Sequence, residues 1–373
     1  MTEKQVLLAV LFSSATAVLA AWLPPPRWQP RLIAAVGAAL LLLLSPLSAC
    51  LLGVGAGLSY LLHRRTGNSR AALVAAVVVI AATLISFMLA AAPAAKGIGG
   101  HVVLPFGLAF YALRLIHYQF EGYKGNLRGH SFDEYLGYLF MPSLLSTGPI
   151  HRFDEYLRDL RRKRWDPALF SAGCARVLYG LVKIVVLGNY LLAEVLPAQF
   201  EALAGAGIGH FYSDALQFWL KLYILFSGYS DVAVGFAALA GFRVRENFDQ
   251  PFIARNISDF WQRWHRSLSS WCRDYVFTPV LSLTRSQGAA VVSSMVVLGL
   301  WHELSLRYVL WGAYHGAGIV IFRAFDARYG ASLDALTGVT AALWRTLATA
   351  LTLHFVLFSF YVTTAVQHWL TGG

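Results

Sequence analysis

Charged side chains are scarce in this sequence. Only 13% of its 373 residues are Asp, Glu, Lys or Arg, about half of the fraction that ordinary soluble domains carry. A soluble fold of this length needs polar residues to cover its surface. A composition that is 57% hydrophobic, with a mean hydropathy of +0.57, does not supply them. The shortage of charge therefore argues against a soluble enzyme and favours an integral membrane protein.

Acidic residues and cysteines are also few. The 19 acidic residues face 30 Lys and Arg, which leaves a net charge of +11. Basic cytoplasmic loops explain this excess in a membrane protein, so we predict no nucleic-acid partner. Cys50, Cys174 and Cys272 stand far apart, which excludes a disulfide framework and a zinc knuckle. The sequence has no HExxH or other metal-ligand spacing, and we predict no metal site.

Long apolar runs dominate what is present. The run within residues 1–22 is expected to be an uncleaved first span. Residues 32–62 carry no charge or histidine and contain Pro46, which predicts a kinked or re-entrant pair of helices. Further uncharged or apolar runs occupy residues 71–95, 101–117, 168–198, 212–241, 275–282, 288–322 and 340–369. These runs predict a single all-α membrane-embedded domain over residues 1–373. It would have about nine to eleven transmembrane helices plus interfacial or re-entrant helices, and residues 1–100 would form its N-terminal spans.

Two polar segments interrupt this series of apolar runs. Residues 151–164 hold six basic residues against three acidic ones, which predicts an interfacial helix on the cytoplasmic face. Residues 242–273 form the longest polar stretch of the chain. On one continuous helix, its end would carry an apolar face of Trp261, Trp264, His265, Leu268, Trp271 and Cys272. The opposite face would carry Gln262, Arg263, Arg266, Ser269, Ser270 and Arg273. We expect the tryptophan face to turn inward and the arginines to face headgroups or water.

Titratable residues inside apolar runs need a partner or a function, because each costs about 2.5–3.5 kcal/mol at a helix centre. Asp231 is one such residue, and we expect a buried hydrogen-bond hub that joins helices. His302 and His315 are two more. On a shared helix they would lie about 140° apart, too far round to share a metal or a proton. Two functions fit these residues: a proton-coupled transporter with a relay, or an intramembrane transferase with a histidine base. The chain lacks a repeat of these segments, which favours the enzyme.

Several ordered motifs resemble a known family. They are FSGYSD at residues 226–231, ENF at 246–248 followed by Pro251 and Phe252, and ISDFWQRWHRSLS at 257–269. A second histidine segment combines LWH at 300–302 with Trp311-Gly312 and His315-Gly316. Together they resemble the membrane-bound O-acyltransferases, in particular the bacterial branch with alginate O-acetyltransferase and the teichoic-acid D-alanyl transferase. The resemblance is strongest over residues 104–320.

This resemblance implies a helical bundle around a central funnel or tunnel, in which His302 is the catalytic histidine and His265 the second histidine. Residues expected to bind substrate or support the site are Asp231, Tyr229, Trp261, Trp264, Trp301, Glu303 and His315. Glu303 stands where the family usually has glycine. Arg263 and Arg266 are expected to steer an anionic donor. They would form a basic cytoplasmic rim with Arg273, Arg158, Arg161, Arg162, Lys163 and Arg164.

The resemblance also implies the reaction and its partners. The acyl group, acetyl in the first instance, would pass from a cytoplasmic thioester donor to a hydroxyl group outside the membrane. The donor would be acetyl-CoA or an acyl carrier protein, with no tightly bound cofactor. The acceptor would be a polysaccharide, a cell-envelope polymer or an extracytoplasmic acyl-transfer partner protein. D-alanyl transfer from a carrier protein is the alternative. The expected location is the bacterial cytoplasmic (inner) membrane, in contact with membrane lipid.

Overall fold

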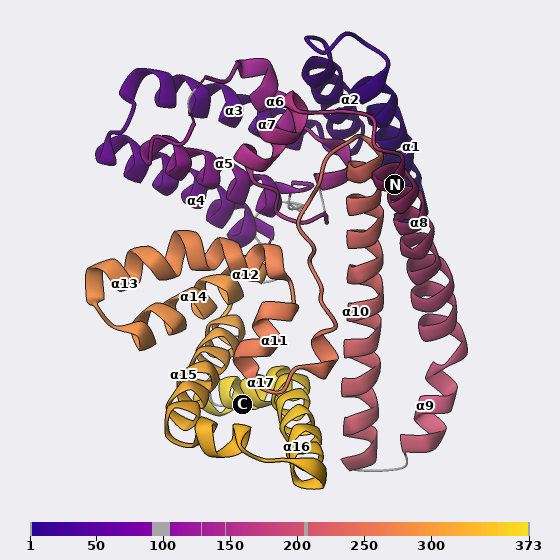
Figure 1. Cartoon of the computed structure of the whole chain (residues 1–373), viewed down its shortest axis with the longest axis vertical. Helices are drawn as coiled ribbons and strands as arrows, with labels where there is room; N and C mark the ends of the chain where they lie inside the picture. Colours follow the sequence, from indigo (N-terminus) through magenta and orange to yellow (C-terminus); the bar gives the residue numbers. More distant parts are fainter. Residues whose placement is uncertain (1, 92–104, 128, 146, 205–207, 372–373) are drawn as a thin grey trace. The chain divides into compact units, whose positions relative to one another are not determined.

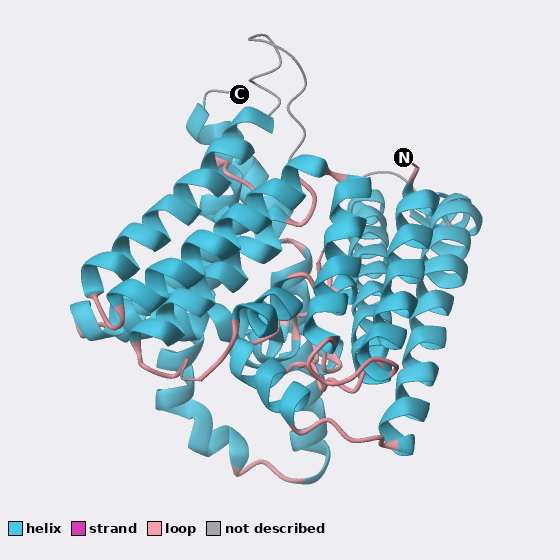
Figure 2. Ribbon diagram, turned by 90° about the horizontal axis from the view of Figure 1, so that it is seen from above, coloured by secondary structure: helices cyan, strands magenta, loops and turns pink. Residues whose placement is uncertain are grey.

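The protein is helical in every regular element that the structure describes. Figure 1 shows the computed structural model, in which residues 2–91, 105–127, 129–145, 147–204 and 208–371 are described. Figure 2 shows helices and loops, without strands, in this described part. The prediction of an all-α fold is confirmed. Residues 92–95 and 101–104, which belong to two of the predicted apolar runs, lie outside the described residues.

Six helical segments within the described ranges are long and apolar enough to cross a membrane. They are Glu3–Trp22 (α1), Pro46–Thr66 (α3), Arg70–Ala91 (α4), Pro167–Val195 (α8 and η3), Tyr212–Leu239 (within α10) and Gly338–Leu357 (α16). The helices Gln29–Leu44 (α2) and Gln287–His302 (α14) are apolar but shorter. Several of the predicted runs are divided between short helices, so the expected nine to eleven crossings stay a prediction.

The chain forms two compact units. The first comprises Met1–Val186 and Leu225–Arg245, and the second comprises Leu187–Ile224 and Glu246–Gly373. Besides the helices already named, the first unit contains α5 (Leu108–Tyr123), α6 (Phe132–Leu139), η2 (Pro142–Leu144) and α7 (Phe153–Arg161). Two helices contribute residues to both units: α8 (Pro167–Leu181) with its π-helical continuation η3 (Val182–Val195), and α10 (Ile208–Leu239).

The second unit is built from many short helices and one long one. Its further elements are α9 (Pro197–Ala204), η4 (Pro251–Ile253), α11 (Ile257–Arg263), α12 (Arg266–Cys272), η5 (Arg273–Phe277), α13 (Thr278–Thr284), α15 (Leu306–Asp334) and α17 (Ser359–Thr371). The long helix α15 packs along α14. Two glycines permit this, because a Cβ at Gly299 would collide with the carbonyl oxygen of Tyr308 and one at Gly312 with that of Met295.

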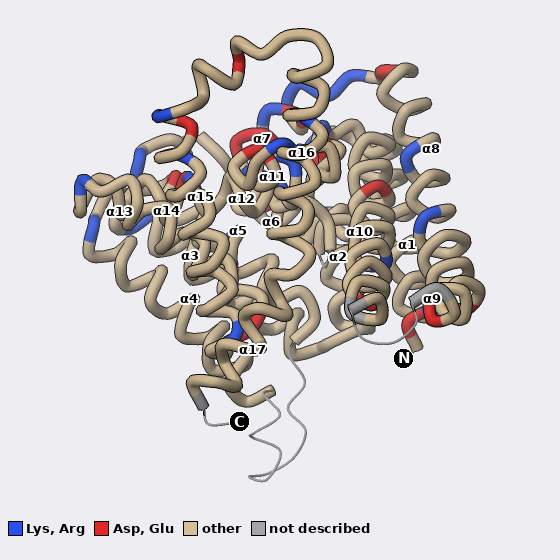
Figure 3. Tube along the Cα trace, turned by 90° about the horizontal axis from the view of Figure 1, so that it is seen from below, with Lys and Arg blue, Asp and Glu red and all other residues tan. Residues whose placement is uncertain are grey.

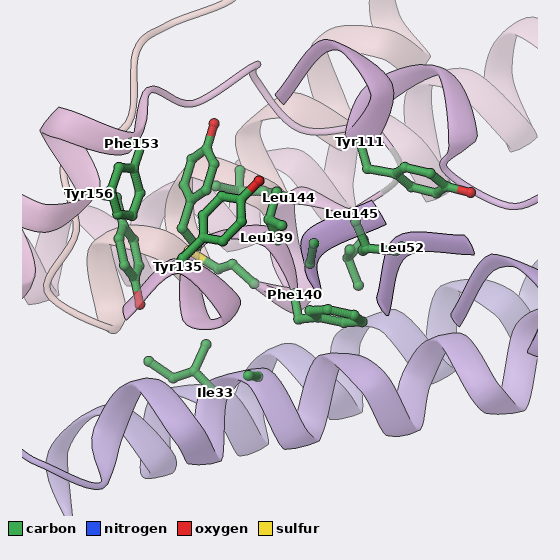
Figure 4. Close-up of a cluster of buried hydrophobic side chains, with 14 of the residues drawn as sticks. Ile33, Leu52, Tyr111, Tyr135, Leu139, Phe140, Leu144, Leu145, Phe153 and Tyr156 are labelled. Atoms are coloured by element: carbon green, nitrogen blue, oxygen red, sulfur yellow. The ribbon is translucent and has the colours of Figure 1, made fainter. Parts of the chain in front are cut away.

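The core of the first unit is aromatic (Figure 4). The rings of Tyr118 and Tyr135 stack with centroids 3.9 Å apart, and those of Tyr156 and Phe242 stack at 4.9 Å. Ser131 caps α6 with a reciprocal capping box, which fixes the start of the helix that carries Tyr135. Burial of such large rings contributes a major part of the packing energy of this unit.

The predicted break at Pro46 is present. Helix α2 ends at Leu44, and Ser45 caps α3 by accepting a hydrogen bond from the backbone N–H of Ser48. Pro46 occupies the first turn of α3, where its missing N–H costs nothing. Proline therefore divides the long apolar run into two helices.

The segment 257–273 is not one continuous helix, and that expectation was wrong. α11 ends at Arg263, and α12 begins after His265, whose backbone is left-handed with φ 45° and ψ 49°. Backbone groups that the break frees find partners in the preceding loop. The N–H of Arg266 donates to Asn247 O at 2.9 Å, and Arg263 O accepts from the N–H of Asp249 at 3.0 Å. These long-range bonds offset the loss of helical hydrogen bonds.

The burial of this segment nevertheless follows the predicted faces. The six residues of the expected apolar face are all buried, from Trp261 to Cys272. The six residues of the polar face are exposed or partly exposed. The left-handed turn at His265 therefore changes the path of the backbone while it keeps the tryptophans inside.

Candidate active site

His302 lies at the C-terminal end of α14 in the second unit. Its side chain is exposed, and the chain turns sharply after it because Glu303 adopts an extended backbone. α15 begins only after the capping residue Ser305. His302 and His315 therefore lie on different helices, so the angle of about 140° calculated for a shared helix does not apply to them. Because α14 ends here, the imidazole of His302 remains accessible to a reactant.

His265 lies beside His302. The two ring centroids are 6.5 Å apart, and the ring of His265 is 6.0 Å from that of Trp301. His265 is only 2% exposed. Burial lowers the pKa of His265 well below its usual value, and the nearby His302 acts in the same direction. His302 has exposed surface, yet burial of its surroundings lowers its pKa to about 4, so both imidazoles are neutral near pH 7.

Two tryptophans lie against the ring of His302, and two more pack behind them or nearby. The ring of Trp301 contacts that of His302 at 4.8 Å, and Trp311 lies 6.3 Å from His302. Trp264 is buried and packs against Trp219 at 5.4 Å. Trp261 packs edge-on against Trp311 at 5.6 Å. The rings of Trp301 and Trp311 limit the space into which the His302 imidazole can turn on these sides.

His315 is placed apart from His302. Its side chain is fully buried, and both of its ring nitrogens lack a hydrogen-bond partner among the residues described. Its ring contacts those of Trp311 at 4.6 Å, Trp261 at 5.3 Å and Phe355 at 5.6 Å. Trp311 thus contacts both His302 and His315. The described geometry assigns His315 to the aromatic packing beside the site.

Glu303 pairs with Arg307, a residue that no sequence motif singles out. Arg307 Nη2 donates to Glu303 Oε2 at 3.3 Å, and both side chains are exposed. The guanidinium of Arg307 lies 5.2 Å from the ring of Tyr308, whose centroid is 6.0 Å from His302. Tyr308 is a second residue that the sequence reasoning missed. The interruption between α14 and α15 brings it near His302, and no helical spacing indicates such an interruption.

Asp231 and Tyr229 belong to the first unit. Asp231 Oδ1 pairs with Arg176 Nη2 at 2.9 Å, and its Oδ2 accepts from Lys183 Nζ at 2.6 Å. The carboxylate therefore connects α10 to α8 and η3. Both basic partners were missed, although charges inside the apolar run 168–198 were a visible signal. Tyr229 packs beside Ile184 in a small apolar cluster of the same unit.

The backbones of α8 and α10 come into close contact on both sides of Asp231 along the helix. A Cβ at Gly180 would lie 2.6 Å from the carbonyl oxygen of Gly228, and one at Gly235 would lie 2.9 Å from that of Gly173. Two glycines on each helix, seven residues apart, therefore let the helix backbones touch above and below Asp231. The arrangement can hold the two helices together.

The expected steering arginines are partly neutralised. Arg263 Nε donates to Asp259 Oδ1 at 2.7 Å, whereas Arg266 Nη1 is 3.8 Å from Asp249 Oδ2. Basic and acidic residues also occur together on α7 (Figure 3). There Arg161 pairs with Glu134 at 2.9 Å.

Within the described ranges no group of three or more His, Cys, Asp or Glu is arranged to hold a metal ion.

Comparison with known proteins identifies the family to which this site belongs. A sequence model of the membrane-bound O-acyltransferase family matches residues 33–360, which include both histidines. The chain belongs to the membrane-bound O-acyltransferase family. This match favours acyl transfer over proton-coupled transport as the function to be tested.

Three curated relatives indicate the range of chemistry in the family. The chain is 35% identical over 231 residues to a protein named probable alginate O-acetylase AlgI from Pseudomonas aeruginosa. The aligned region covers 60% of this chain and 44% of the relative. It is 31% identical over 242 residues to the teichoic acid D-alanyltransferase of Bacillus subtilis, with 60% and 59% covered. It is 26% identical over 259 residues to the peptidoglycan O-acetyltransferase of Helicobacter pylori, with 61% and 49% covered. The chain thus spans about half the length of these relatives.

Proposed function

We propose that this protein is an O-acyltransferase in which His302 is the general base. The observation that carries the proposal is the pair of imidazoles, one accessible at the end of α14 and one buried 6.5 Å away. A neutral imidazole takes the proton of a hydroxyl group as its oxygen attacks the carbonyl carbon of a thioester. The C–O bond forms, the C–S bond breaks, and the thiolate leaves with a proton from the imidazolium. General-base assistance of this kind is worth roughly 10²–10⁴-fold in rate.

We assign His265 a positioning role. It is buried among aromatic rings and touches Trp301, which in turn contacts His302. Such a residue fixes the reacting imidazole and limits the water around it. The rings of Tyr308 and Trp311 also lie close to the ring of His302.

The proposed substrates follow from the relatives. The donor is a thioester, acetyl-CoA in the first instance, and the acceptor is a hydroxyl of a cell-envelope polysaccharide or of an extracytoplasmic partner protein. The named activities of the alginate and peptidoglycan relatives support acetyl transfer. The bacterial relatives and the apolar helices support a location in the bacterial inner membrane. We further propose that both compact units belong to one functional domain.

D-alanyl transfer from a carrier protein is the second candidate. The observation that favours it is the teichoic-acid relative, of which this chain covers 59%, a larger share than of the alginate relative.

The experiment gives purified full-length protein either radiolabelled acetyl-CoA or a carrier protein loaded with radiolabelled D-alanine. If label is released or transferred from just one of the two donors, that donor identifies the acyl group. His302→Ala should abolish that signal. His210→Ala is the matched control because His210 is an exposed histidine with a side chain 56% exposed. Equal activity in a folded His302→Ala protein and in the control would refute the proposed base.

A further inference from the structure

Arg114 of α5 is a buried cation without an acidic partner. Its side chain is 1% exposed, and Nη1 donates to the carbonyl oxygen of Tyr138 at 3.3 Å. Nε and Nη2 make no hydrogen bond among the described residues, and none of the ion pairs in that part of the chain includes Arg114. A guanidinium does not lose its charge in proteins, and a buried unpaired charge costs several kcal/mol. The charge of Arg114 therefore calls for an anion.

The two unpartnered nitrogens lie along one edge of the guanidinium. Nε–H and the adjacent Nη2–H point in parallel, which is the geometry that binds two oxygens of one carboxylate or phosphate. Tyr138 holds this edge in place from the other side, because its carbonyl binds Nη1 and its ring lies 5.9 Å from the guanidinium carbon. The free edge is thus oriented before any ligand arrives.

His151 supplies a third donor beside Arg114. It is fully buried, and neither ring nitrogen has a hydrogen-bond partner within the described part of the protein. Tyr138 connects the two residues, since its hydroxyl donates to His151 O at 2.8 Å and its ring centroid is 6.3 Å from that of His151. Burial, with the charge of Arg114 as the next cause, lowers the pKa of His151 to about 3. The ring is neutral near pH 7 and has one N–H to donate.

Glu155 is the carboxylate that the described residues place near His151, and only one of its oxygens is hydrogen-bonded. Glu155 Oε2 is 3.8 Å from His151 Nδ1, but Glu155 Oε1 binds Arg245 Nη2 at 2.6 Å. The side chains of Arg245 and Arg158 are 40% and 51% exposed, and both add positive potential at His151. This potential extends from the buried cluster to the surface and attracts anions toward it.

We propose that Arg114 and His151 form a binding site for a phosphate group. The parallel Nε–H and Nη2–H groups of Arg114 match two oxygens of one phosphate, and the neutral His151 ring, which lies near the same Tyr138 ring, offers a further N–H. Phosphopantetheine-bearing thioester donors and phospholipid headgroups both carry such a group. The acyl donor as the source of this phosphate group rests on the proposed function. The binding site itself is inferred from the geometry of the first unit alone. Since the site is enclosed by side chains, we expect slow association.

The test measures binding to the full-length protein in detergent, without turnover. Melting temperature and equilibrium binding are recorded with inorganic phosphate, with coenzyme A that carries no acyl group, and with sodium chloride at equal ionic strength. A fourth arm places the protein in vesicles of phosphatidylglycerol. We expect phosphate to raise the melting temperature where chloride does not. Arg114→Lys keeps the charge but loses the two-nitrogen edge, and it should weaken binding at least tenfold.

Arg65→Gln is the matched control, because it removes a positive charge from an exposed position of the same unit that takes no part in the proposed site. It should change binding less than twofold at physiological salt. His151→Gln, which keeps one amide donor and changes no charge at neutral pH, tests the site if Arg114→Lys fails to fold. We expect it to weaken binding about three- to tenfold.

The measurements with coenzyme A and with vesicles distinguish the two sources of the phosphate group. Arg114-dependent binding of coenzyme A supports the donor, and dependence seen only in phosphatidylglycerol vesicles assigns the site to a lipid. No stabilisation by any of the probes, or equal binding by wild type and both site variants, would overturn the site. Loss of acyl transfer in the proposed function leaves these binding results unaffected, so the two proposals fail separately.

Discussion

The imidazole of His265 lies 6.5 Å from that of His302, and the two differ sharply in exposure. His265 is 2% exposed, whereas His302 is open at the end of its helix. An accessible ring can reach a substrate hydroxyl, while a buried ring can only act through its neighbours. The difference in exposure is the basis on which we propose different roles for the two residues.

His302→Ala should reduce acyl transfer by at least 10²-fold, with a melting temperature close to that of wild type. The loss follows from removal of the proposed base, and the small effect on stability follows from the exposure of the side chain. His265→Ala should reduce transfer less and lower the melting temperature more. Product formation and thermal unfolding measured on the same preparations check both. A total loss of activity at both positions would instead point to a mechanism that needs two histidines.

The left-handed backbone of His265 predicts a distinct pattern of stability. Its φ of 45° costs roughly 1–2 kcal/mol for most residues, but asparagine tolerates this region well. His265→Asn should therefore unfold at a higher temperature than His265→Val, since a β-branched side chain is strained there. Thermal unfolding in detergent compares the two variants. Equal melting temperatures would show that the turn relaxes after substitution.

The sequence could predict the helical class and the burial of the tryptophan face, because both depend on hydrophobic patterning alone. It could not predict the turn at His265. That turn is stabilised by Asn247 and Asp249, which lie outside the helical period. Tyr308 was missed for the same reason, since its contact with His302 depends on where α14 ends. Arg176 and Lys183 were missed although their charge in an apolar run was visible in the sequence.

Gly180→Ala should destabilise the protein by about 1–3 kcal/mol, because the added methyl group would lie 2.6 Å from the backbone of Gly228. Gly57→Ala, in α3, is the control. Nothing lies within 4 Å of its added Cβ, and alanine is the better helix former, so stability should stay the same or rise. Chemical denaturation of both variants measures the difference. A neutral Gly180→Ala would mean that the two helices can separate at no cost.

Burial of neutral His151 predicts that the unliganded protein loses stability in acid. The pKa of His151 is about 3 in the folded protein, against 6.5 for an ordinary histidine. The unfolded chain therefore binds a proton first, and stability falls as the pH drops from 6.5 toward 3 by up to about 1.4 kcal/mol per pH unit. His151→Gln should make this slope shallower by the share of one group, because the other buried histidines, among them His117, also have lowered pKa values. Melting temperatures recorded across that pH range, without phosphate, test the prediction, and an unchanged slope would contradict it.

Arg266 rather than Arg263 should steer an anionic donor. Arg263 is held by Asp259 at 2.7 Å and also donates to Asp249 O at 3.1 Å, so its charge is largely compensated. Arg266 is 3.8 Å from Asp249, and both side chains are about half exposed. Long-range attraction by an exposed charge weakens as salt is raised.

Arg266→Gln should therefore raise the donor KM about two- to fivefold at low salt and reduce its dependence on ionic strength, while kcat stays the same. Arg263→Gln is the matched control with the same change of charge. It should leave the salt dependence intact and lower the melting temperature instead, because it removes the bonds that hold the end of α11. Steady-state kinetics at several salt concentrations separate the two variants. An identical salt dependence in wild type and Arg266→Gln would leave this arginine only a topological role on a basic membrane face.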